Sequence, residues 1–207
     1  MTWIKICGIT NREDALKAVS LGIEAVGFIF APSPRRVDPL TVREIVQDLP
    51  PSVLKVGVFV NQDLTEIEKT AKDCSLNILQ LHGEESSHYC QRSSFPVIKA
   101  IRVKGPESLK EMDLYPHVAL LLDTYHPGKA GGTGSPFSWE IALKAREKRD
   151  FILSGGLAPE NVGEAIRKVR PLGVDINSGV ESEPGKKDFS KMVEFVKEVK
   201  KADEKTQ

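Results

Sequence analysis

The sequence predicts an α/β fold, a single domain in which eight strand–helix units close into a (β/α)8 barrel, the TIM barrel. Short apolar runs alternate with helical patterns along all 207 residues, and strands separated by helices pair in parallel through right-handed crossovers. The last two strand candidates end in small residues at 154–156 and 177–179, where such a barrel usually has an anion site. The turn after the first strand lacks a G-x-G-x-x-G pattern, which disfavours an open doubly wound sheet.

The predicted strands are short runs rich in apolar, β-branched or aromatic residues. They cover 3–7, 25–30, 54–60, 77–81, 97–101, 118–123, 151–153 and 174–176. No shift in composition marks a linker between any two of them. We therefore expect one domain over 1–207, with a polar tail at 201–207 that frays.

The predicted helices begin and end at recognisable cap residues. Thr10 with Glu13 forms a capping box for the first helix, and Gly22 ends it. Asp38 and Pro39 fit the N-cap and first residue of the second. The helices are expected at 11–21, 39–48, 64–73, 85–92, 107–112 (a weak pattern), 139–148 after the cap residue Ser138, 159–169 and 189–200.

Composition excludes several classes of protein. Lys plus Arg and Asp plus Glu both number 29, so a net charge of zero gives no electrostatic case for nucleic acid or an anionic membrane. No apolar run approaches the ~20 residues that span a bilayer. The chain enters a strand pattern at Trp3 without a signal peptide, and three cysteines lack metal-type spacing. We expect a cytoplasmic protein with reduced thiols and no metal site.

Reactive side chains fall where predicted strands end, and in this fold those ends form the active face. They are Cys7, Arg35, Arg36, Gln80, His82, Arg102, Asp123, Asp175 and Asn177. Each also has a structural interpretation. His82 follows an apolar strand, and a supporting role is favoured for it over a catalytic one.

Two of these residues could transfer protons. Cys7 is either a small buried hydrophobe or a base, and a thiolate base requires a cation or helix N-terminus that lowers its pKa. Asp123 is either a turn carboxylate or a proton donor, since apolar surroundings such as Leu120–Leu122 favour the protonated carboxyl. Arg36 is either a solvated charge or a planar fork for a substrate carboxylate.

The glycine-rich strand ends around Gly155, Gly156, Ser178 and Gly179 are either ordinary turns or a phosphate site. Their tandem placement at the end of the chain favours phosphate. A third glycine-rich loop at 124–137 lacks G-x-x-x-x-G-K-[ST], which disfavours a nucleotide site. We expect that loop to be mobile beside Asp123.

The segments KICGIT, AVGFIF with SPRRV, VGVFVN, LQLHGEE, LLDT, GGTG with FSW, LSGGLAPENV and VDINSGVE occur in this order. Together they resemble the phosphoribosylanthranilate isomerase family of tryptophan biosynthesis, from Ile4 to about Val196. The resemblance implies an Amadori rearrangement of a phosphosugar substrate without a cofactor, by a monomer or homodimer. Ser135, Pro136 and Ser138 depart from the family pattern after GGTG.

The same resemblance assigns roles by position. It implies Cys7 as the general base, Asp123 as the general acid and Arg36 as the ligand of the anthranilate carboxylate. The phosphate would bind Gly155, Gly156, Ser178 and Gly179. From their places at the strand ends, Gln80, His82, Asp175 and Asn177 are expected to support the site. Two alternatives stay open: a non-catalytic phosphate-binding barrel, and a dual-substrate aminoaldose isomerase that also acts in histidine biosynthesis.

Overall fold

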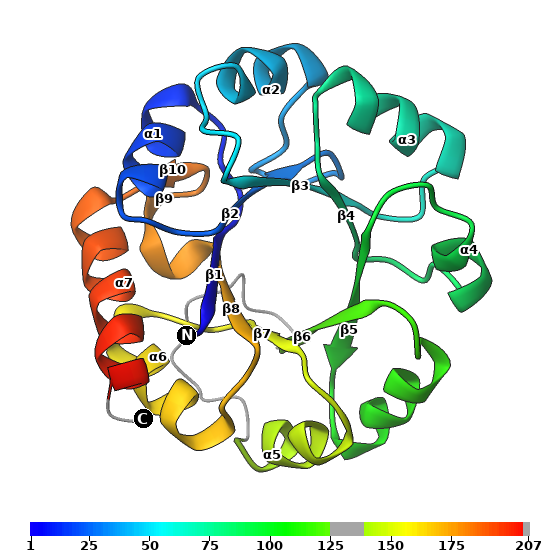
Figure 1. Ribbon diagram of the computed structural model, residues 1–207, viewed down its shortest axis with the longest axis vertical. Coiled ribbons are helices and arrows are strands. Elements are labelled where there is room, and N and C mark those ends of the chain that lie inside the picture. The colour runs from blue at the N-terminus through cyan, green and yellow to red at the C-terminus, as the bar shows by residue number, and fades with distance from the viewer. Residues whose placement is uncertain (125–138, 205–207) are drawn as a thin grey trace.

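The computed structural model describes residues 1–124 and 139–204. Eight parallel strands form a closed barrel in chain order, and the last strand pairs with the first (Figure 1). They are β1 (Trp3–Ile6), β2 (Ala25–Ile29), β3 (Leu54–Phe59), β4 (Ile78–Leu81), β5 (Val97–Val103), β6 (Ala119–Thr124), β7 (Ile152–Ser154) and β8 (Gly173–Ile176). The predicted fold class is confirmed.

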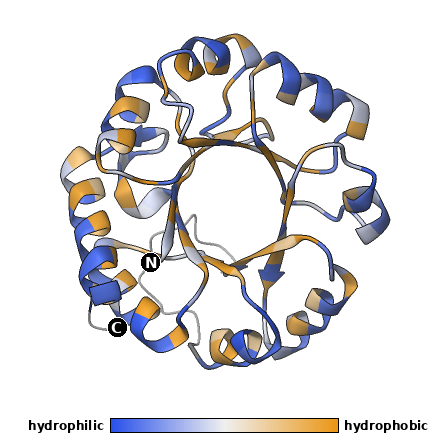
Figure 2. Ribbon diagram, in the orientation of Figure 1, coloured by the Kyte–Doolittle hydropathy of each residue, from blue (hydrophilic) through white to orange (hydrophobic). Residues whose placement is uncertain are grey.

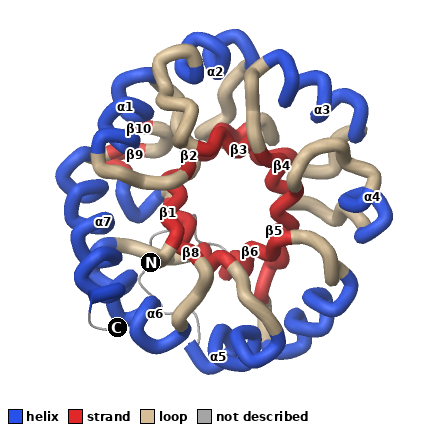
Figure 3. Tube along the Cα trace, in the orientation of Figure 1, coloured by secondary structure: helices blue, strands red, loops and turns tan. Residues whose placement is uncertain are grey.

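Helices surround the ring of strands (Figure 3). They are α1 (Arg12–Ser20), α2 (Pro39–Val46), α3 (Leu64–Asp73), α4 (Ser87–Gln91), α5 (Trp139–Lys148), α6 (Pro159–Val169) and α7 (Phe189–Glu204), with a 3-10 helix η1 (Pro106–Leu114) after β5. Among the described helices, none is long and apolar enough to cross a membrane.

Side chains alternate between the two faces of the barrel wall, because successive residues of a strand point to opposite sides. The main core lies between the strands and the helices, and includes Ile4 and Ile6 of β1. A smaller apolar cluster comprises Ile98, Ala100, Leu121 and Ile152, on alternate positions of their strands. Figure 2 shows largely hydrophobic strands inside helices of mixed hydropathy. Lys5, which lies between Ile4 and Ile6 in β1, forms a hydrogen bond and an ion pair across the barrel, as described below.

Most cap predictions hold, but the first helix begins one residue later than expected. Asn11 is the N-cap of α1, and its Oδ1 accepts from the amide of Asp14 at 2.8 Å. Thr10 fails as a cap because its hydroxyl donates to the carbonyl of Gly185. Gly22, with φ of +76°, follows the end of α1 as expected. Asp38 caps α2 with Pro39 in the first turn, as predicted.

The end of the chain is more structured than predicted. Residues 201–204, expected to fray, continue α7, because Ala202 is buried and Asp203 accepts from the amide of Thr2 at 2.7 Å. Residues 205–207, loop residues 125–137 and Ser138 lie outside the described residues. Between β8 and α7 the sequence missed a 3-10 turn, η2 (Ser178–Val180), and a hairpin of β9 (Glu181–Glu183) and β10 (Lys186–Lys187).

Candidate active site

Cys7 lies directly after β1, at the rim formed by the carboxyl ends of the strands, which we call the barrel mouth. Its amide donates to the carbonyl of Ile176 at 2.8 Å, which fixes it beside β8. On the other side, a Cβ placed on Gly27 of β2 would lie 2.6 Å from the sulfur. Gly27 therefore provides the space that the thiol occupies, and Cys7 is only 4% exposed.

Lys5, two residues before Cys7, places a buried charge inside the barrel. Its Nζ lies 2.8 Å from Oδ2 of Asp175 in β8 and 2.8 Å from Oε1 of Gln80 in β4. Burial opposes the ammonium, but the charges of Asp175 and Cys7 and their hydrogen bonds raise the pKa of Lys5. Oδ1 of Asp175 is buried and has no hydrogen-bond partner among the described residues.

Gln80, His82 and Asp123 continue this arrangement to the barrel mouth. Nε2 of Gln80 lies 3.1 Å from Nδ1 of His82, and Nε2 of His82 lies 3.1 Å from Oδ2 of Asp123. Gln80 is buried, whereas His82 and Asp123 are partly exposed. The structure thus brings together Gln80, His82, Asp123 and Asp175, which the sequence predicted only to share one edge, and adds Lys5 of β1.

The thiol of Cys7 is surrounded by groups with opposing effects. Burial is the largest effect and raises the pKa of Cys7, and the nearby charge of Asp175 acts in the same direction. The ammonium groups of Lys5 and Lys187 lower it, but do not offset burial. The cations that a thiolate base requires are present, yet burial outweighs them and favours the thiol form.

A second group of cations, Arg35 and Lys187, lies near the end of β8. Arg35 forms a bidentate ion pair with Glu181, with Nε to Oε1 at 2.8 Å and a second nitrogen to Oε2 at 2.6 Å. Lys187 lies 3.0 Å from Oε1 of Glu181 and 3.0 Å from Oδ1 of Asn177. Asn177 is packed so closely that a Cβ on Gly8 would lie 2.5 Å from its Oδ1. Asn177 therefore links β8 to the hairpin.

Arg36, by contrast, has no hydrogen bond or ion pair from its side chain among the described residues. It is exposed, and it lines a hollow of about 340 Å³ together with Phe30, Phe59 and Lys69. The rings of Phe30 and Phe59 stack with centroids 4.9 Å apart. The hollow thus combines a free guanidinium with aromatic walls, next to the loop after β2.

The glycine-rich ends of β7 and β8 lie against each other. Gly155 and Gly156 have φ of +84° and +66°, which glycine adopts without a steric penalty. A Cβ on Gly179 would lie 2.1 Å from the carbonyl oxygen of Leu157, so the two loops are in contact. Among the described residues, the amides of Gly155 and Gly156 have no acceptor. Two free N–H groups suit an anion.

The sequence missed a buried ion pair that supports the loop after β4. Nζ of Lys99 lies 3.0 Å from Oε2 of Glu85 and donates to the carbonyl of Gly83 at 2.6 Å. Oε2 of Glu85 also accepts from the amide of Gly83 at 2.9 Å. Arg102 donates to the carbonyl of His82 at 3.1 Å. The sequence did contain a signal for Lys99 and for Lys5. Each is a lysine inside an apolar run, VIKAI for Lys99 and WIKI for Lys5, which indicates a buried charge.

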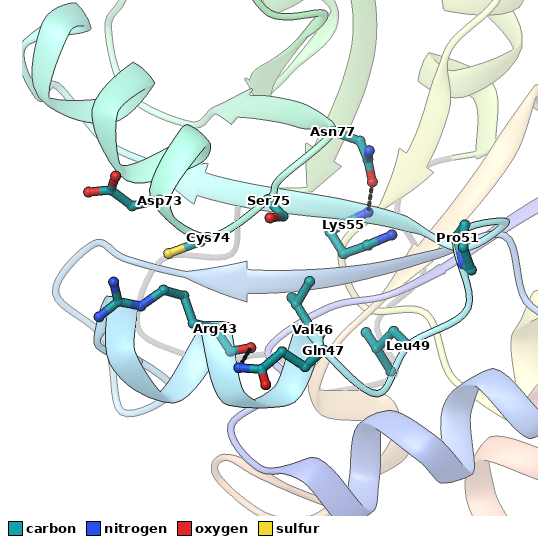
Figure 4. A pocket seen from close by; sticks show the side chains of 10 residues that line it. All are labelled: Arg43, Val46, Gln47, Leu49, Pro51, Lys55, Asp73, Cys74, Ser75 and Asn77. Carbon is teal, nitrogen blue, oxygen red and sulfur yellow. Dashed lines mark hydrogen bonds between the residues drawn. The ribbon is translucent and has the colours of Figure 1, made fainter.

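A larger cavity, of about 530 Å³, lies away from these residues, at the opposite end of the barrel. Figure 4 shows it lined by Arg43, Lys55, Cys74 and Asn77, among others, with the amide of Lys55 bonded to Oδ1 of Asn77 at 2.8 Å. Within residues 1–124 and 139–204, no group of three or more His, Cys, Asp or Glu side chains is placed to hold a metal ion.

Comparison with known proteins identifies the family. Residues 4–198 match the family model described as N-(5'phosphoribosyl)anthranilate (PRA) isomerase. The N-(5'-phosphoribosyl)anthranilate isomerase of Geobacter sp. (strain M21) is 49% identical over 202 residues, which is 97% of this chain and 99% of the relative.

Comparison with solved structures leads to the same family. Phosphoribosyl anthranilate isomerase from Thermotoga maritima is 45% identical, with a TM-score of 0.93 over 97% of this chain and 100% of its own. Another isomerase structure, in complex with reduced 1-(o-carboxyphenylamino)-1-deoxyribulose 5-phosphate, is 43% identical with a TM-score of 0.89 over the same shares. The chain therefore belongs to the N-(5'-phosphoribosyl)anthranilate isomerase family.

Proposed function

We propose that this chain converts N-(5-phosphoribosyl)anthranilate to 1-(2-carboxyphenylamino)-1-deoxyribulose 5-phosphate, with Asp123 as general acid and Cys7 as general base. The observation that carries the proposal is the arrangement of these two groups. Each stands at the carboxyl end of a barrel strand, and Lys5, Gln80 and His82 connect their surroundings. A solved relative that binds a reduced form of the product supports the substrate class.

The rearrangement needs two proton transfers on the ribose. Asp123 donates a proton to the ring oxygen as its bond to C1′ breaks, which leaves an iminium ion at C1′. The Cys7 thiolate then removes the proton from C2′ and forms an enolamine. The enolamine becomes the ketone when the 2′-hydroxyl loses its proton and C1′ gains one. Each transfer is typically worth about 10²–10⁴-fold in rate.

Binding groups hold the sugar against the acid and the base. The free amides of Gly155 and Gly156, with Ser178 and Gly179 on the touching loop, are the proposed phosphate site. Phosphate binding at β7 and β8 would place the ribose over the barrel mouth, so that remote binding energy contributes to the reaction. Asp175 and Asn177 support this edge through their bonds to Lys5 and Lys187.

We expect the wild-type protein to isomerise freshly made substrate, and the thiolate form of Cys7 to increase with pH. The base must be a thiolate, and burial raises the pKa of Cys7, so the ionised fraction grows as pH rises through that value. Loss of substrate fluorescence measures turnover, and the ultraviolet absorbance of the thiolate, taken as the difference between wild type and Cys7→Ser from about pH 6 to pH 10, measures the ionised fraction. A Cys7 sulfur that is already fully ionised at the acid end of this range would contradict the raised pKa. No fluorescence loss at any pH would favour a non-catalytic phosphate-binding barrel.

Replacing Arg36 with Met should raise KM by roughly 10- to 100-fold and leave kcat little changed, because a charge-assisted bond to the anthranilate carboxylate acts before and during the reaction. Steady-state kinetics with the same fluorescence assay measure both constants. Lys69→Met, which alters another cation of the same hollow, is the matched control and should keep KM. An unchanged KM in the Arg36 variant would show that Arg36 does not bind the substrate carboxylate.

A further inference from the structure

The hydrogen bonds from Lys5 to Asp123 have a direction that side-chain chemistry determines. A lysine ammonium only donates, so the Gln80 oxygen at 2.8 Å must accept. The Gln80 amide nitrogen, 3.1 Å from Nδ1 of His82, then faces the ring and can only donate. Nδ1 therefore accepts and carries no proton, which places the ring proton on Nε2, 3.1 Å from Oδ2 of Asp123.

The reverse arrangement is disfavoured at both ends. If the Gln80 amide turned over, its NH2 group would face the ammonium of Lys5, donor against donor. If His82 carried a proton on Nδ1, that proton would face the NH2 group of Gln80. Because Lys5 and Gln80 are 0% and 1% exposed, water does not compete for these bonds. One direction of the hydrogen bonds that run from Lys5 through Gln80 and His82 to Asp123 is therefore favoured.

We propose that Lys5 is a positioning residue that holds His82, through Gln80, as the neutral tautomer with its proton on Nε2, and thereby orients Asp123. The inference rests on the proposed role of Asp123 as the acid. His82 donates to one carboxyl oxygen, Oδ2, so the proton that the acid delivers resides on the other. After the transfer, the same donor stabilises the carboxylate that forms.

The position of Lys5 also couples the acid to the base. The groups that face its ammonium are Asp175 from β8, Gln80 from β4 and the sulfur of Cys7, directly after its own strand. On the other side, a Cβ on Gly27 of β2 would lie 2.9 Å from Cε of Lys5. The buried ammonium of Lys5 thus lies beside the base. Through Gln80 it also holds the His82 N–H that donates to the acid.

Gln80→Glu tests the inference because it keeps the size of the side chain and reverses one bond. Both oxygens of a carboxylate accept, one from Lys5 and one from Nδ1 of His82, so the ring must carry a proton on Nδ1. Nitrogen NMR of the ring, assigned by comparison with His82→Asn, should show a proton on Nε2 alone in the wild type and a proton on Nδ1 in Gln80→Glu. We expect kcat to fall about 10- to 100-fold with little change in KM.

Two further variants keep the test decisive. The double variant Lys5→Met with Asp175→Asn removes both buried charges, and so avoids the cost of an unpaired carboxylate. It should give a mixture of His82 tautomers even if Gln80→Glu does not fold. Lys55→Met, a buried lysine of β3 at the other end of the barrel (Figure 4), is the matched control and should keep the wild-type spectrum and kcat.

A proton on Nδ1 in the wild type would overturn the inference, and so would an unchanged His82 spectrum in Gln80→Glu or in the double variant. The spectra are recorded without substrate, so they do not depend on turnover. Should Asp123→Asn retain wild-type turnover, the proposed acid would be wrong, whereas the tautomer of His82 would still be decided by NMR.

Discussion

Asp123→Asn should lower kcat by about 100- to 10,000-fold, the range of a lost general acid. The amide has nearly the same shape as the carboxylic acid, but its NH2 group is far too weak an acid to protonate the ring oxygen. Its carbonyl oxygen can still accept from Nε2 of His82, the bond that spans 3.1 Å in the wild type. Local geometry should therefore persist, and steady-state kinetics should show the loss in kcat with KM within a few-fold.

The control for this variant is Asp73→Asn, which alters a partly exposed carboxylate at the end of α3, in the cavity at the opposite end of the barrel. It should behave as wild type. Binding of the reduced product analogue to the Asp123 variant, measured by calorimetry, separates chemistry from affinity. If binding weakened in parallel with kcat, Asp123 would be a ligand of the substrate and not its acid.

The fold could be predicted from local patterns, because each strand and most caps depend on neighbouring residues. Asp38 with Pro39 marks the start of α2, and Asp63 caps α3 by accepting from Thr65 and Glu66. Thr10 was misassigned for a physical reason. Its hydroxyl bonds to Gly185, 175 residues away, so Asn11 takes the role of the cap. A local pattern contains no information on such a partner.

For the candidate site, the sequence could predict only which residues lie at the barrel mouth. Cys7, His82 and Asp123 were expected at the barrel mouth because parallel strands end on the same side. Gln80, Asp175 and Asn177 were expected there as supports, but Lys5 was not, since it meets Gln80 across 75 residues and the barrel must close before the two can touch. Lys187 was missed as well, because the hairpin that carries it is only a few residues long and lacks a clear alternating pattern.

The charge state of Cys7 also differs from the simple expectation. A neighbouring cation was expected to favour the thiolate, and two are present, but burial of the sulfur outweighs them and raises its pKa. The anionic substrate would enter the same mouth and exclude further water. Lys5 and Lys187 are the groups that could stabilise the thiolate there, which explains why both lie so close to it.

Cys7→Ser should lower kcat by about 100- to 10,000-fold, since the base that removes the C2′ proton is lost. A serine hydroxyl fits the space left by Gly27, but it does not ionise in the range where a thiol does, even beside Lys5. The thiolate absorbance assigned to Cys7 should disappear together with the rate. Cys90→Ser, which alters another buried thiol in the outer core, should keep both the rate and the absorbance assigned to Cys7. If Cys7→Ser kept turnover near the wild-type rate, another group would be the base.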